Sequence, residues 1–173
     1  IGSNTVRLLI LETDGNQKFQ TLASRRVITR LGEGMDTYGK LMESRMSETF
    51  SALSRFQKEC VEHGNPPLFA VATSAVREAS NGQEFIRQAL KKTGIKIEII
   101  SWEEEARLTL EGVFWKIPHE NRRILTFDIG GGSTEFILSE GKNIAGFCSS
   151  SLGVVRLTEK FISQHPIDDT EYK

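Results

Sequence analysis

Hydrophobic and polar positions along the first half of the chain predict a β-hairpin followed by alternating helices and strands. Alternating or continuous apolar runs are typical of strands, whereas apolar residues at steps of three and four are typical of helices. Asp14-Gly15 is a typical two-residue hairpin turn, so the first two strands should be antiparallel. The expected elements are a strand at residues 4–11, one or two strands at residues 19–31, a helix capped by Ser47 and ended by Gly64, a strand at residues 68–72, a helix at residues 81–90 and a strand at residues 95–100.

A similar pattern starts again in the second half of the chain. Ser101 followed by Glu104 matches a capping box, which predicts a helix from Ser101 to about Lys116 that ends before Pro118. The elements expected after it are strands at residues 123–128, 135–138 and 143–148, with a turn at Glu140-Gly141, and a helix at residues 153–164. Because a strand-rich segment with a small-residue turn opens both halves, we predict two similar α/β domains, residues 1–117 and residues 118–173, of which the second is incomplete. Their two turns should face each other across a cleft.

Composition and charge narrow the class of protein. The chain has 173 residues, of which 38% are hydrophobic, so it can bury a real core. Lys and Arg number 22 against 23 Asp and Glu, and this balance provides no global positive field for nucleic acid or for an anionic membrane. No apolar run is long enough to cross a bilayer, and Cys60 and Cys148 have no framework spacing, so we expect a protein of the reducing cytoplasm.

Two turns of small residues are the candidate anion-binding elements. They are Gly2-Ser3-Asn4-Thr5 and Gly130-Gly131-Gly132-Ser133-Thr134. Glycine permits φ > 0 and lets backbone N–H groups approach a ligand closely, and successive N–H groups form a nest for phosphate. A single glycine cluster between strands is more typical of a simple turn, but two such turns at the start of two similar halves favour paired phosphate sites. Walker and Rossmann loops lead into a helix, whereas here Thr134 opens a strand.

Two carboxylates flank the second turn. Asp128 ends the strand before it and Glu135 follows it. An acid at a strand end can simply accept hydrogen bonds from turn N–H groups. Beside bound phosphate, however, a carboxylate is repelled unless a cation lies between the two groups. The pattern therefore points to Mg²⁺, which proteins hold with one or two carboxylates together with water and phosphate oxygens.

A further acidic run and one arginine are candidates for the walls of the cleft. Glu103, Glu104 and Glu105 lie in the first turn of a helix, where acids commonly complement the helix dipole. A glutamate at a helix end beside a cleft can also act as a general base toward water. The spacing leaves open which of the three faces inward. Arg77 follows a buried strand and could bind phosphate as a bidentate guanidinium, or could be a solvated surface side chain.

Five segments carry a family resemblance. They are GSNT at residues 2–5, ATSAVR at 72–77, IEIISWEEEARL at 97–108, DIGGGSTE at 128–135 and SLGVVRL at 151–157. On these segments the chain resembles the exopolyphosphatase/guanosine pentaphosphate phosphohydrolase (Ppx/GppA) family, within the superfamily of actin, sugar kinases and Hsp70 ATPase domains. DIGGGSTE with EEAR upstream is much more specific than a glycine cluster alone. The resemblance implies an α/β fold of the duplicated RNase H-like (actin-like ATPase) type, with a mixed sheet flanked by helices and a truncated second domain.

The resemblance also implies an activity and roles for particular residues. The expected reaction is hydrolysis of a terminal phosphoanhydride, on polyphosphate or on guanosine pentaphosphate (pppGpp to ppGpp), with Mg²⁺ in an interdomain cleft. Glutamate directly before Ala-Arg is catalytic in such enzymes, which selects Glu105. Asp128 would hold the metal and its water, and Glu135 would be a second essential carboxylate that also serves the metal. Phosphate contacts are expected from Gly2, Ser3, Asn4, Thr5, Arg77, Gly130, Gly131, Gly132, Ser133, Thr134 and Gly153. Such enzymes are often homodimers.

The chain departs from the family pattern at both ends. The family places an Asp before its first Ile/Leu-Gly-Ser-Asn motif, whereas this chain opens at Ile1 without an initiating Met. It ends at Lys173, before most of the second domain and any C-terminal HD-type domain. We therefore expect a fragment or trimmed chain, which could lack activity without the missing parts of the site. An actin-like ATPase or sugar kinase, and a polyphosphate or nucleotide sensor without turnover, stay as alternatives to the hydrolase.

Overall fold

A long β-hairpin opens the fold. The computed structural model describes residues 1–15, 18–115, 117–118 and 122–162. Strands β1 (Thr5–Thr13) and β2 (Phe19–Ile28) pair antiparallel, as expected, and β2 is one strand rather than two. Thr13 pairs with Phe19, so the connection spans residues 14–18 and the prediction of a two-residue turn was wrong. Gly15 does adopt a left-handed φ of 80° within this longer loop.

Two short parallel strands lie beside the hairpin and are joined to it by hydrogen bonds from the first residue of the chain. Strands β3 (Ala70–Ala72) and β4 (Ile97–Ile99) run parallel to each other. The nitrogen of Ile1 donates to the carbonyl oxygen of Val71 at 2.7 Å, and Thr73 N–H donates back to Ile1 at 3.1 Å. These bonds join the hairpin to β3, so the first half contains parallel and antiparallel pairing, as the mixed-sheet prediction requires.

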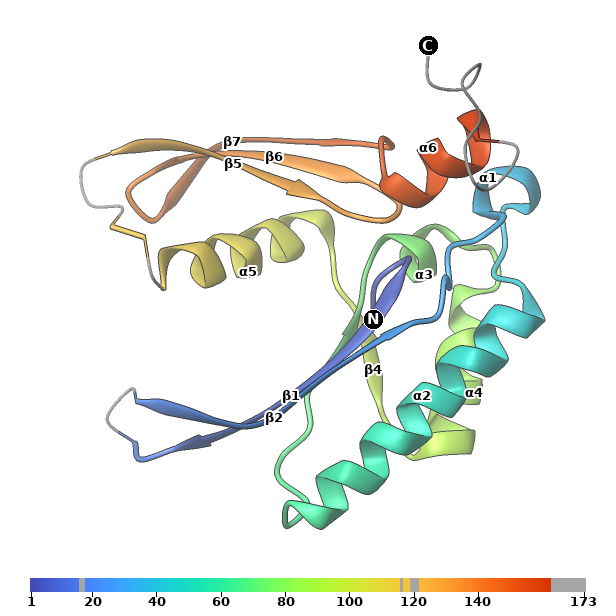
Figure 1. Cartoon of the computed structure of the whole chain (residues 1–173). Coiled ribbons are helices and arrows are strands. Elements are labelled where there is room, and N and C mark those ends of the chain that lie inside the picture. Colours follow the sequence, from blue (N-terminus) through green and yellow to red (C-terminus); the bar gives the residue numbers. More distant parts are fainter. Residues whose placement is uncertain (16–17, 116, 119–121, 163–173) are drawn as a thin grey trace.

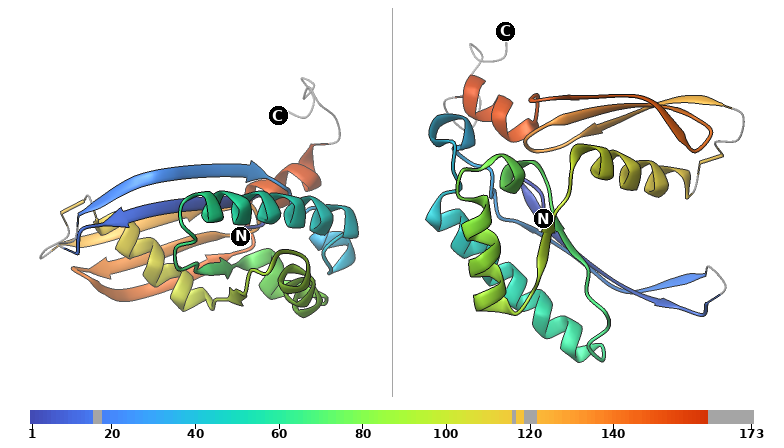
Figure 2. Two further views of the ribbon diagram at one scale, coloured as in Figure 1. Left: turned by 90° about the horizontal axis from the view of Figure 1, so that it is seen from below. Right: turned by 180° about the vertical axis from the view of Figure 1, so that it is seen from behind.

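Two helices cover one side of this sheet. Helices α2 (Glu43–Glu62) and α4 (Gly82–Thr93) lie side by side, with α2 against β1 and α4 against β4 (Figures 1 and 2). They bury a common core in which the rings of Phe50 and Phe85 stack with centroids 5.2 Å apart. Helix α2 begins at Glu43, one turn before the expected cap, so Ser47 lies inside it and the predicted start was wrong. Met46 lies in the first turn of α2 and is fully buried, so the buried face of the helix begins before Ser47.

Two short helices were not anticipated from the sequence. They are α1 (Met35–Tyr38) and α3 (Ser74–Glu78), each too short for apolar periodicity to be visible. Helix α3 follows β3 closely and contains the Ser-Ala-Val-Arg part of ATSAVR, with Ala75 and Val76 in the core. It therefore brings Ser74 and Arg77 to the same end of the sheet as the first small-residue turn.

The second half forms a separate antiparallel sheet with a helix along one face. Strands β5 (Arg123–Ile129), β6 (Thr134–Glu140) and β7 (Asn143–Ser150) pair in that order. Helix α5 (Trp102–Phe114) packs under β6 and β7, where Ala106 and Leu110 bury Ile137 (Figure 1). The domain boundary expected near Pro118 stays a prediction, and α5, which precedes it, packs on this second sheet.

The ends of α5 and of the last helix complete the second half. Ser101 caps α5 as expected by accepting the N–H of Glu104 at 3.2 Å, but the Glu104 carboxylate pairs with Arg107 instead of returning to the cap. The expected end of α5 at Lys116 lies outside the described residues. Helix α6 (Val154–Phe161) begins as expected after Gly153, and its expected end at Gln164 also lies outside them. No described helix is both long and apolar enough to cross a membrane.

Candidate active site

The two small-residue turns touch each other and line one cleft together. Its volume is about 590 Å³, and the expected cleft at the turns is therefore present. Residues from both turns line it, together with three carboxylates and two arginines. The lining residues are Ile1, Gly2, Ser3, Asn4, Thr5, Arg7, Arg26, Thr73, Ser74, Glu105, Asp128, Ile129, Gly130, Gly131, Gly132, Ser133, Glu135 and Val154.

Close approach explains the glycines of the second turn. A Cβ on Gly132 would lie 2.6 Å from Ser74 Oγ and 2.7 Å from Ser3 Oγ. A Cβ on Gly131 would lie 2.9 Å from the Cβ of Asn4. Neither glycine has a left-handed φ, so the expectation that φ > 0 selects glycine was wrong for this turn. Glycine is required because the turn presses against the first turn and against α3, leaving no room for side chains.

The first turn is fixed by its own backbone and by the chain after β2. Gly2 N–H donates to the carbonyl oxygen of Thr5 at 3.0 Å. The carbonyl oxygen of Ser3 accepts the N–H of Gly32 at 2.7 Å, and that of Asn4 accepts the N–H of Arg30 at 3.1 Å. The second turn closes on itself in a similar way, because Gly130 N–H donates to Ser133 at 2.8 Å. Both turns are therefore preorganised before any ligand binds.

Glu105 is the member of the acidic run that faces the cleft. Glu103 is exposed and Glu104 is paired with Arg107, whereas the side chain of Glu105 is only 18% exposed. Burial raises the pKa of Glu105 above its ordinary value. The hydrogen bond from Arg77 lowers this pKa in part, and the nearby carboxylates of Glu135 and Asp128 raise it again. The structure thus answers which of the three glutamates points inward.

Arg77 holds Glu105 and does not line the cleft. Its Nη1 donates to Glu105 Oε2 at 3.0 Å and to the carbonyl oxygen of Ile100 at 2.8 Å. Its guanidinium lies 3.5 Å from the ring centroid of Trp102, in cation–π contact. Its buried Nε and Nη2 have no hydrogen-bond partner within the described part of the chain. Arg77 is therefore placed to orient a carboxylate, and the expected phosphate contact stays a prediction.

Asp128 and Glu135 are direct cross-strand partners. They face each other in the register of β5 and β6, so both carboxylates lie on the same face of the sheet. Glu135 is 3% exposed and accepts a hydrogen bond from Ser149 Oγ at 3.1 Å. Neither carboxylate forms an ion pair with a described Lys or Arg. Like charges in this position repel each other, which a bound cation would relieve.

The described residues contain no cluster of three or more His, Cys, Asp or Glu side chains arranged to hold a metal ion. Two carboxylates without a cationic partner are nevertheless enough for Mg²⁺, which keeps several waters and takes further oxygens from phosphate. Asp128 and Glu135 therefore fit the chemistry of a magnesium site that is completed by the substrate.

Two other expected phosphate contacts lie behind the cleft. The hydroxyl of Thr134 donates to the carbonyl oxygen of Leu152, and Thr134 does not line the cleft. Gly153 packs against the back of the second turn, where an added Cβ would lie 2.3 Å from the carbonyl oxygen of Gly131. Both residues support the turn from the side away from the cleft, and a phosphate contact for them stays a prediction.

Arg7 and Arg26 are cleft residues that the sequence reasoning did not assign. They are cross-strand partners on β1 and β2, and both line the cleft. Neither forms an ion pair with a described acid, whereas the adjacent Arg25 is paired with Glu59. Side chains alternate between the two faces of a strand, so the sequence places Arg25 and Arg26 on opposite faces of β2. That Arg26 lies opposite Arg7 follows from the register of the hairpin and could not be predicted from the sequence. The pair supplies unneutralised positive charge on the wall opposite the second turn.

Comparison with known proteins identifies the family of the chain. The Ppx/GppA phosphatase family model matches residues 9–173. Exopolyphosphatase 1 of Mycobacterium tuberculosis is 32% identical over 166 residues, which cover 96% of this chain and 48% of that protein. The chain thus spans about half the length of this relative.

Two crystal structures have the same fold. An exopolyphosphatase from Cytophaga hutchinsonii superposes with a TM-score of 0.89 at 34% identity, over 99% of this chain and 55% of that one. The Aquifex aeolicus Ppx/GppA phosphatase superposes with a TM-score of 0.74 at 34% identity, over 99% of this chain and 57% of that one. The expected α/β fold of the duplicated RNase H-like (actin-like) type is confirmed. Because the family match extends over nearly the whole chain and these structures share its fold, the chain belongs to the Ppx/GppA phosphatase family.

Proposed function

We propose that the full-length protein hydrolyses the terminal phosphoanhydride bond of inorganic polyphosphate or guanosine pentaphosphate and releases orthophosphate. The observation that carries the proposal is the cleft in which two preorganised turns face Glu105, Asp128 and Glu135. The mycobacterial relative named exopolyphosphatase 1 supports polyphosphate as one substrate. Guanosine pentaphosphate presents the same terminal bond, so the same turns can bind it.

In this proposal Glu105 is the general base. Its Oε2 is held by Arg77, whereas Oε1 has no partner among the described residues and is available to accept a proton from water. The raised pKa of Glu105 makes it a stronger base than an ordinary carboxylate. The water oxygen attacks the terminal phosphorus, its proton passes to Glu105, and the bond from phosphorus to the bridging oxygen breaks.

The two turns and the cleft arginines bind the phosphate groups. Phosphoryl transfer depends mainly on positioning and on stabilising charge at the phosphoryl oxygens, because the protein has little covalent chemistry to perform. Backbone N–H groups and hydroxyls of the two turns can cradle neighbouring phosphates of one substrate. Arg7 and Arg26 can neutralise phosphates farther along the chain, because guanidinium groups match phosphate geometry.

A magnesium ion is part of the proposal. Asp128 and Glu135 would hold it, since they share one face of the sheet and have no described cationic partner. When bound, Mg²⁺ would neutralise charge on phosphate oxygens beside these two carboxylates. Ser149 donates to Glu135 and so orients one of the two ligands.

The direct test measures phosphate release from long-chain polyphosphate and from guanosine pentaphosphate by the full-length protein with Mg²⁺. Glu105→Gln should lower kcat by about 10²–10⁴-fold, the usual contribution of a general base. Glu103→Gln is the matched control, because that exposed side chain lies on the same helix turn and does not line the cleft. It should behave as the wild type does.

The outcomes separate the alternatives. Release that requires Glu105 supports the hydrolase, and the ratio of kcat/KM values for the two substrates identifies the preferred one. Turnover of ATP with no release from either substrate would overturn the proposal in favour of an actin-like ATPase or kinase. Tight binding of both substrates without release would indicate a sensor.

A further inference from the structure

Helix α6 supports the second turn from behind. Val154 N–H donates to the carbonyl oxygen of Gly130 at 2.9 Å, and Val155 N–H donates to that of Gly131 at 2.8 Å. The first free N–H groups of α6 are therefore used to hold the turn. Gly153 lies so close behind it that an added Cβ would be 2.3 Å from Gly132 C. The position of α6 thus sets the position of the turn.

The same helix is fastened to the first half of the chain by one arginine. Figure 1 and the right-hand view of Figure 2 show α6 beside α1. Arg156 of α6 pairs through Nη2 with Glu78 Oε2 at 2.5 Å, and through Nε with Asp36 Oδ1 at 3.2 Å. Its side chain is only 13% exposed, which sets it apart from the surface arginines of the chain. Arg156 therefore links α6 to α3 and to α1 at once.

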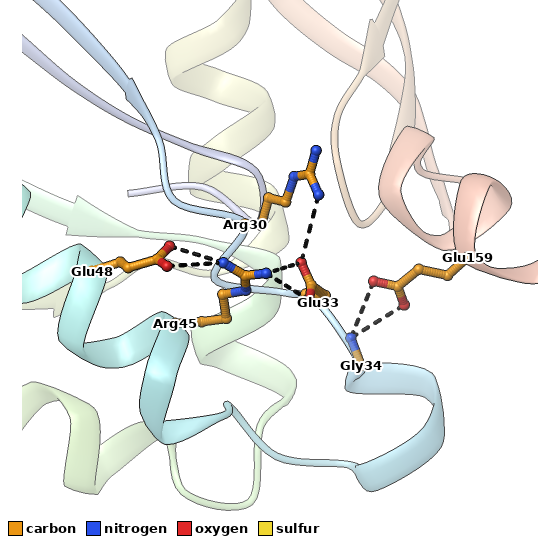
Figure 3. A network of polar contacts seen from close by, with 6 residues as sticks. All are labelled: Arg30, Glu33, Gly34, Arg45, Glu48 and Glu159. Atoms are coloured by element: carbon orange, nitrogen blue, oxygen red, sulfur yellow. Dashed lines mark hydrogen bonds and ion pairs between the residues drawn. The ribbon is translucent and has the colours of Figure 1, made fainter. Parts of the chain in front are cut away.

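A second contact joins α6 to the loop before α1. The N–H of Gly34 donates to both carboxylate oxygens of Glu159 at 3.2 Å (Figure 3). That loop is itself fixed, because Arg45 pairs with Glu33 at 2.7 Å and with Glu48 at 3.0 Å (Figure 3). Helix α6 therefore contacts a loop that is itself tied to α2 by ion pairs.

Glu78 carries the link from Arg156 into the cleft. Its Oε2 accepts from Arg156, and its Oε1 accepts from Ser74 Oγ at 3.0 Å. Ser74 lines the cleft and is the residue against which Gly132 packs, with only 2.6 Å between Ser74 Oγ and the position of an added Cβ. Arg156 therefore acts on both sides of the contact between the second turn and α3, through α6 on one side and through Glu78 on the other.

We propose that Arg156 is a positioning residue for the proposed phosphoanhydride hydrolysis: it holds the Gly130–Ser133 turn against Ser3 and Ser74, and so sets the spacing of the two phosphate-binding turns. It does not line the cleft and touches no reacting atom. Its two carboxylate partners bind different nitrogens of one planar fork, an arrangement that the single ammonium group of lysine cannot reproduce. The activity readout of this inference rests on the proposed function, but its structural readout does not.

The kinetic test compares Arg156→Lys, Arg156→Gln, Glu78→Gln and the double variant Arg156→Gln/Glu78→Gln in the full-length protein. Each single variant should lower kcat by about 10²-fold, the cost of a misplacement of roughly 1 Å in a catalytic site, and change KM far less. Arg156→Lys should fail to restore kcat. Because the two residues act through one link, the double variant should be no slower than the slower single variant. Arg123→Gln, which removes an exposed pair with Glu140, is the control.

The structural test uses hydrogen exchange and needs no turnover. In Arg156→Gln, amide exchange should become faster in peptides that cover residues 130–134 and 153–157, and stay unchanged in β1, β2 and α2. Additive kinetic effects, a full rescue by lysine, or faster exchange throughout the protein would overturn the proposal and leave Arg156 a general contributor to stability. Altered local exchange in a protein without phosphatase activity would uphold the link and refute the proposed function alone.

Discussion

Arg77 and Glu105 form a hydrogen-bonded ion pair of 3.0 Å between Nη1 and Oε2, with both side chains largely buried. Nη1 also binds the carbonyl oxygen of Ile100, and the guanidinium stacks on Trp102. These contacts leave the arginine little freedom, so the carboxylate it binds is fixed as well. Glu105 Oε2 therefore accepts the hydrogen bond that fixes the side chain, whereas Oε1 has no partner among the described residues and is available to a ligand in the cleft.

Arg77→Gln should move the acid limb of the pH–rate profile to higher pH. Arg77 lowers the pKa of Glu105, against the larger effect of burial that raises it, so its removal lets that pKa rise further. A base that takes up its proton at higher pH loses activity earlier as the pH falls. The measurement is kcat/KM for phosphate release across the pH range, with Arg87→Gln as the control because Arg87 pairs with Glu84 on the surface. An acid limb that stays in place would contradict the pairing.

Glu105 should make the folded protein less stable as the pH rises through its pKa. Its pKa is raised in the folded state, so the folded chain holds that proton more tightly than the unfolded chain does. The stabilising contribution is present below the unfolded pKa and is lost as the pH rises through the folded one. Thermal unfolding of wild type and Glu105→Gln without Mg²⁺ should therefore show the variant gaining relative stability between acidic and neutral pH. A difference in Tm that is constant with pH would show that burial does not perturb Glu105.

Asp128→Asn should separate metal binding from folding. Asp128 and Glu135 lie directly opposite each other on the adjacent strands β5 and β6. Removing one of the two charges relieves their repulsion, which costs about 0.2–1 kcal/mol for such pairs. The variant should therefore melt at the same or a higher temperature than wild type in EDTA. It should lose the rise in Tm that Mg²⁺ produces by binding the folded state. Glu140→Gln, at the far end of β6 from Glu135, should keep that rise. A lower Tm in EDTA and a retained Mg²⁺ effect would exclude Asp128 as a ligand.

Much of the fold could be predicted from the sequence, because long elements leave a periodic pattern. Helices α4 and α5 and the strands around Gly130–Ser133 have apolar positions at regular steps and small-residue ends, which local physics fixes. Helix α3 could not be found in this way, since one turn of small residues carries no period. The start of α2 was missed because Met46 is buried by contacts with distant segments, which no local cap signals.

The motifs that form the candidate site could be found in the sequence, but the contacts between their side chains could not. Both turns and the acids beside the second turn could be selected from residue type and spacing, whereas Glu105 was selected from the acidic run only by the family resemblance. That Arg77 binds Glu105 depends on how α3 meets α5, and no spacing encodes it. The same holds for Arg7 and Arg26, whose pairing follows from the hairpin register. The packing that requires glycine at Gly131 and Gly132 could not be predicted either, because it depends on contacts with Ser3, Asn4 and Ser74, and neither glycine has a positive φ.

Gly132→Ala should push the two turns apart. The new Cβ would meet Ser74 Oγ at 2.6 Å and Ser3 Oγ at 2.7 Å, both of which lie in the opposite half of the cleft. Overpacking of this kind costs about 1–3 kcal/mol of stability, and the displaced turn should also lower kcat. Gly112→Ala is the matched control, because that glycine lies in α5 with nothing within 4 Å of an added Cβ. It should stabilise the protein by about 0.5–1 kcal/mol. Equal effects of the two substitutions on urea unfolding would contradict the close contact.

Arg7→Gln and Arg26→Gln should weaken substrate binding more than they slow the reaction. The two guanidinium groups line the cleft without a described acidic partner, so each is free to bind a phosphate away from the bond that breaks. Loss of a contact that is equal in the ground state and the transition state raises KM and leaves kcat unchanged. Because exposed charges are screened by salt, each variant should also show a smaller rise in KM with ionic strength than wild type does.

The matched control is Arg25→Gln, which removes the neighbouring charge on β2 that is already paired with Glu59. Initial rates on long-chain polyphosphate at several salt concentrations give both quantities. A fall in kcat at constant KM would instead place these arginines at the reacting phosphate, and an effect of Arg25→Gln as large as theirs would reduce all three to general surface charge.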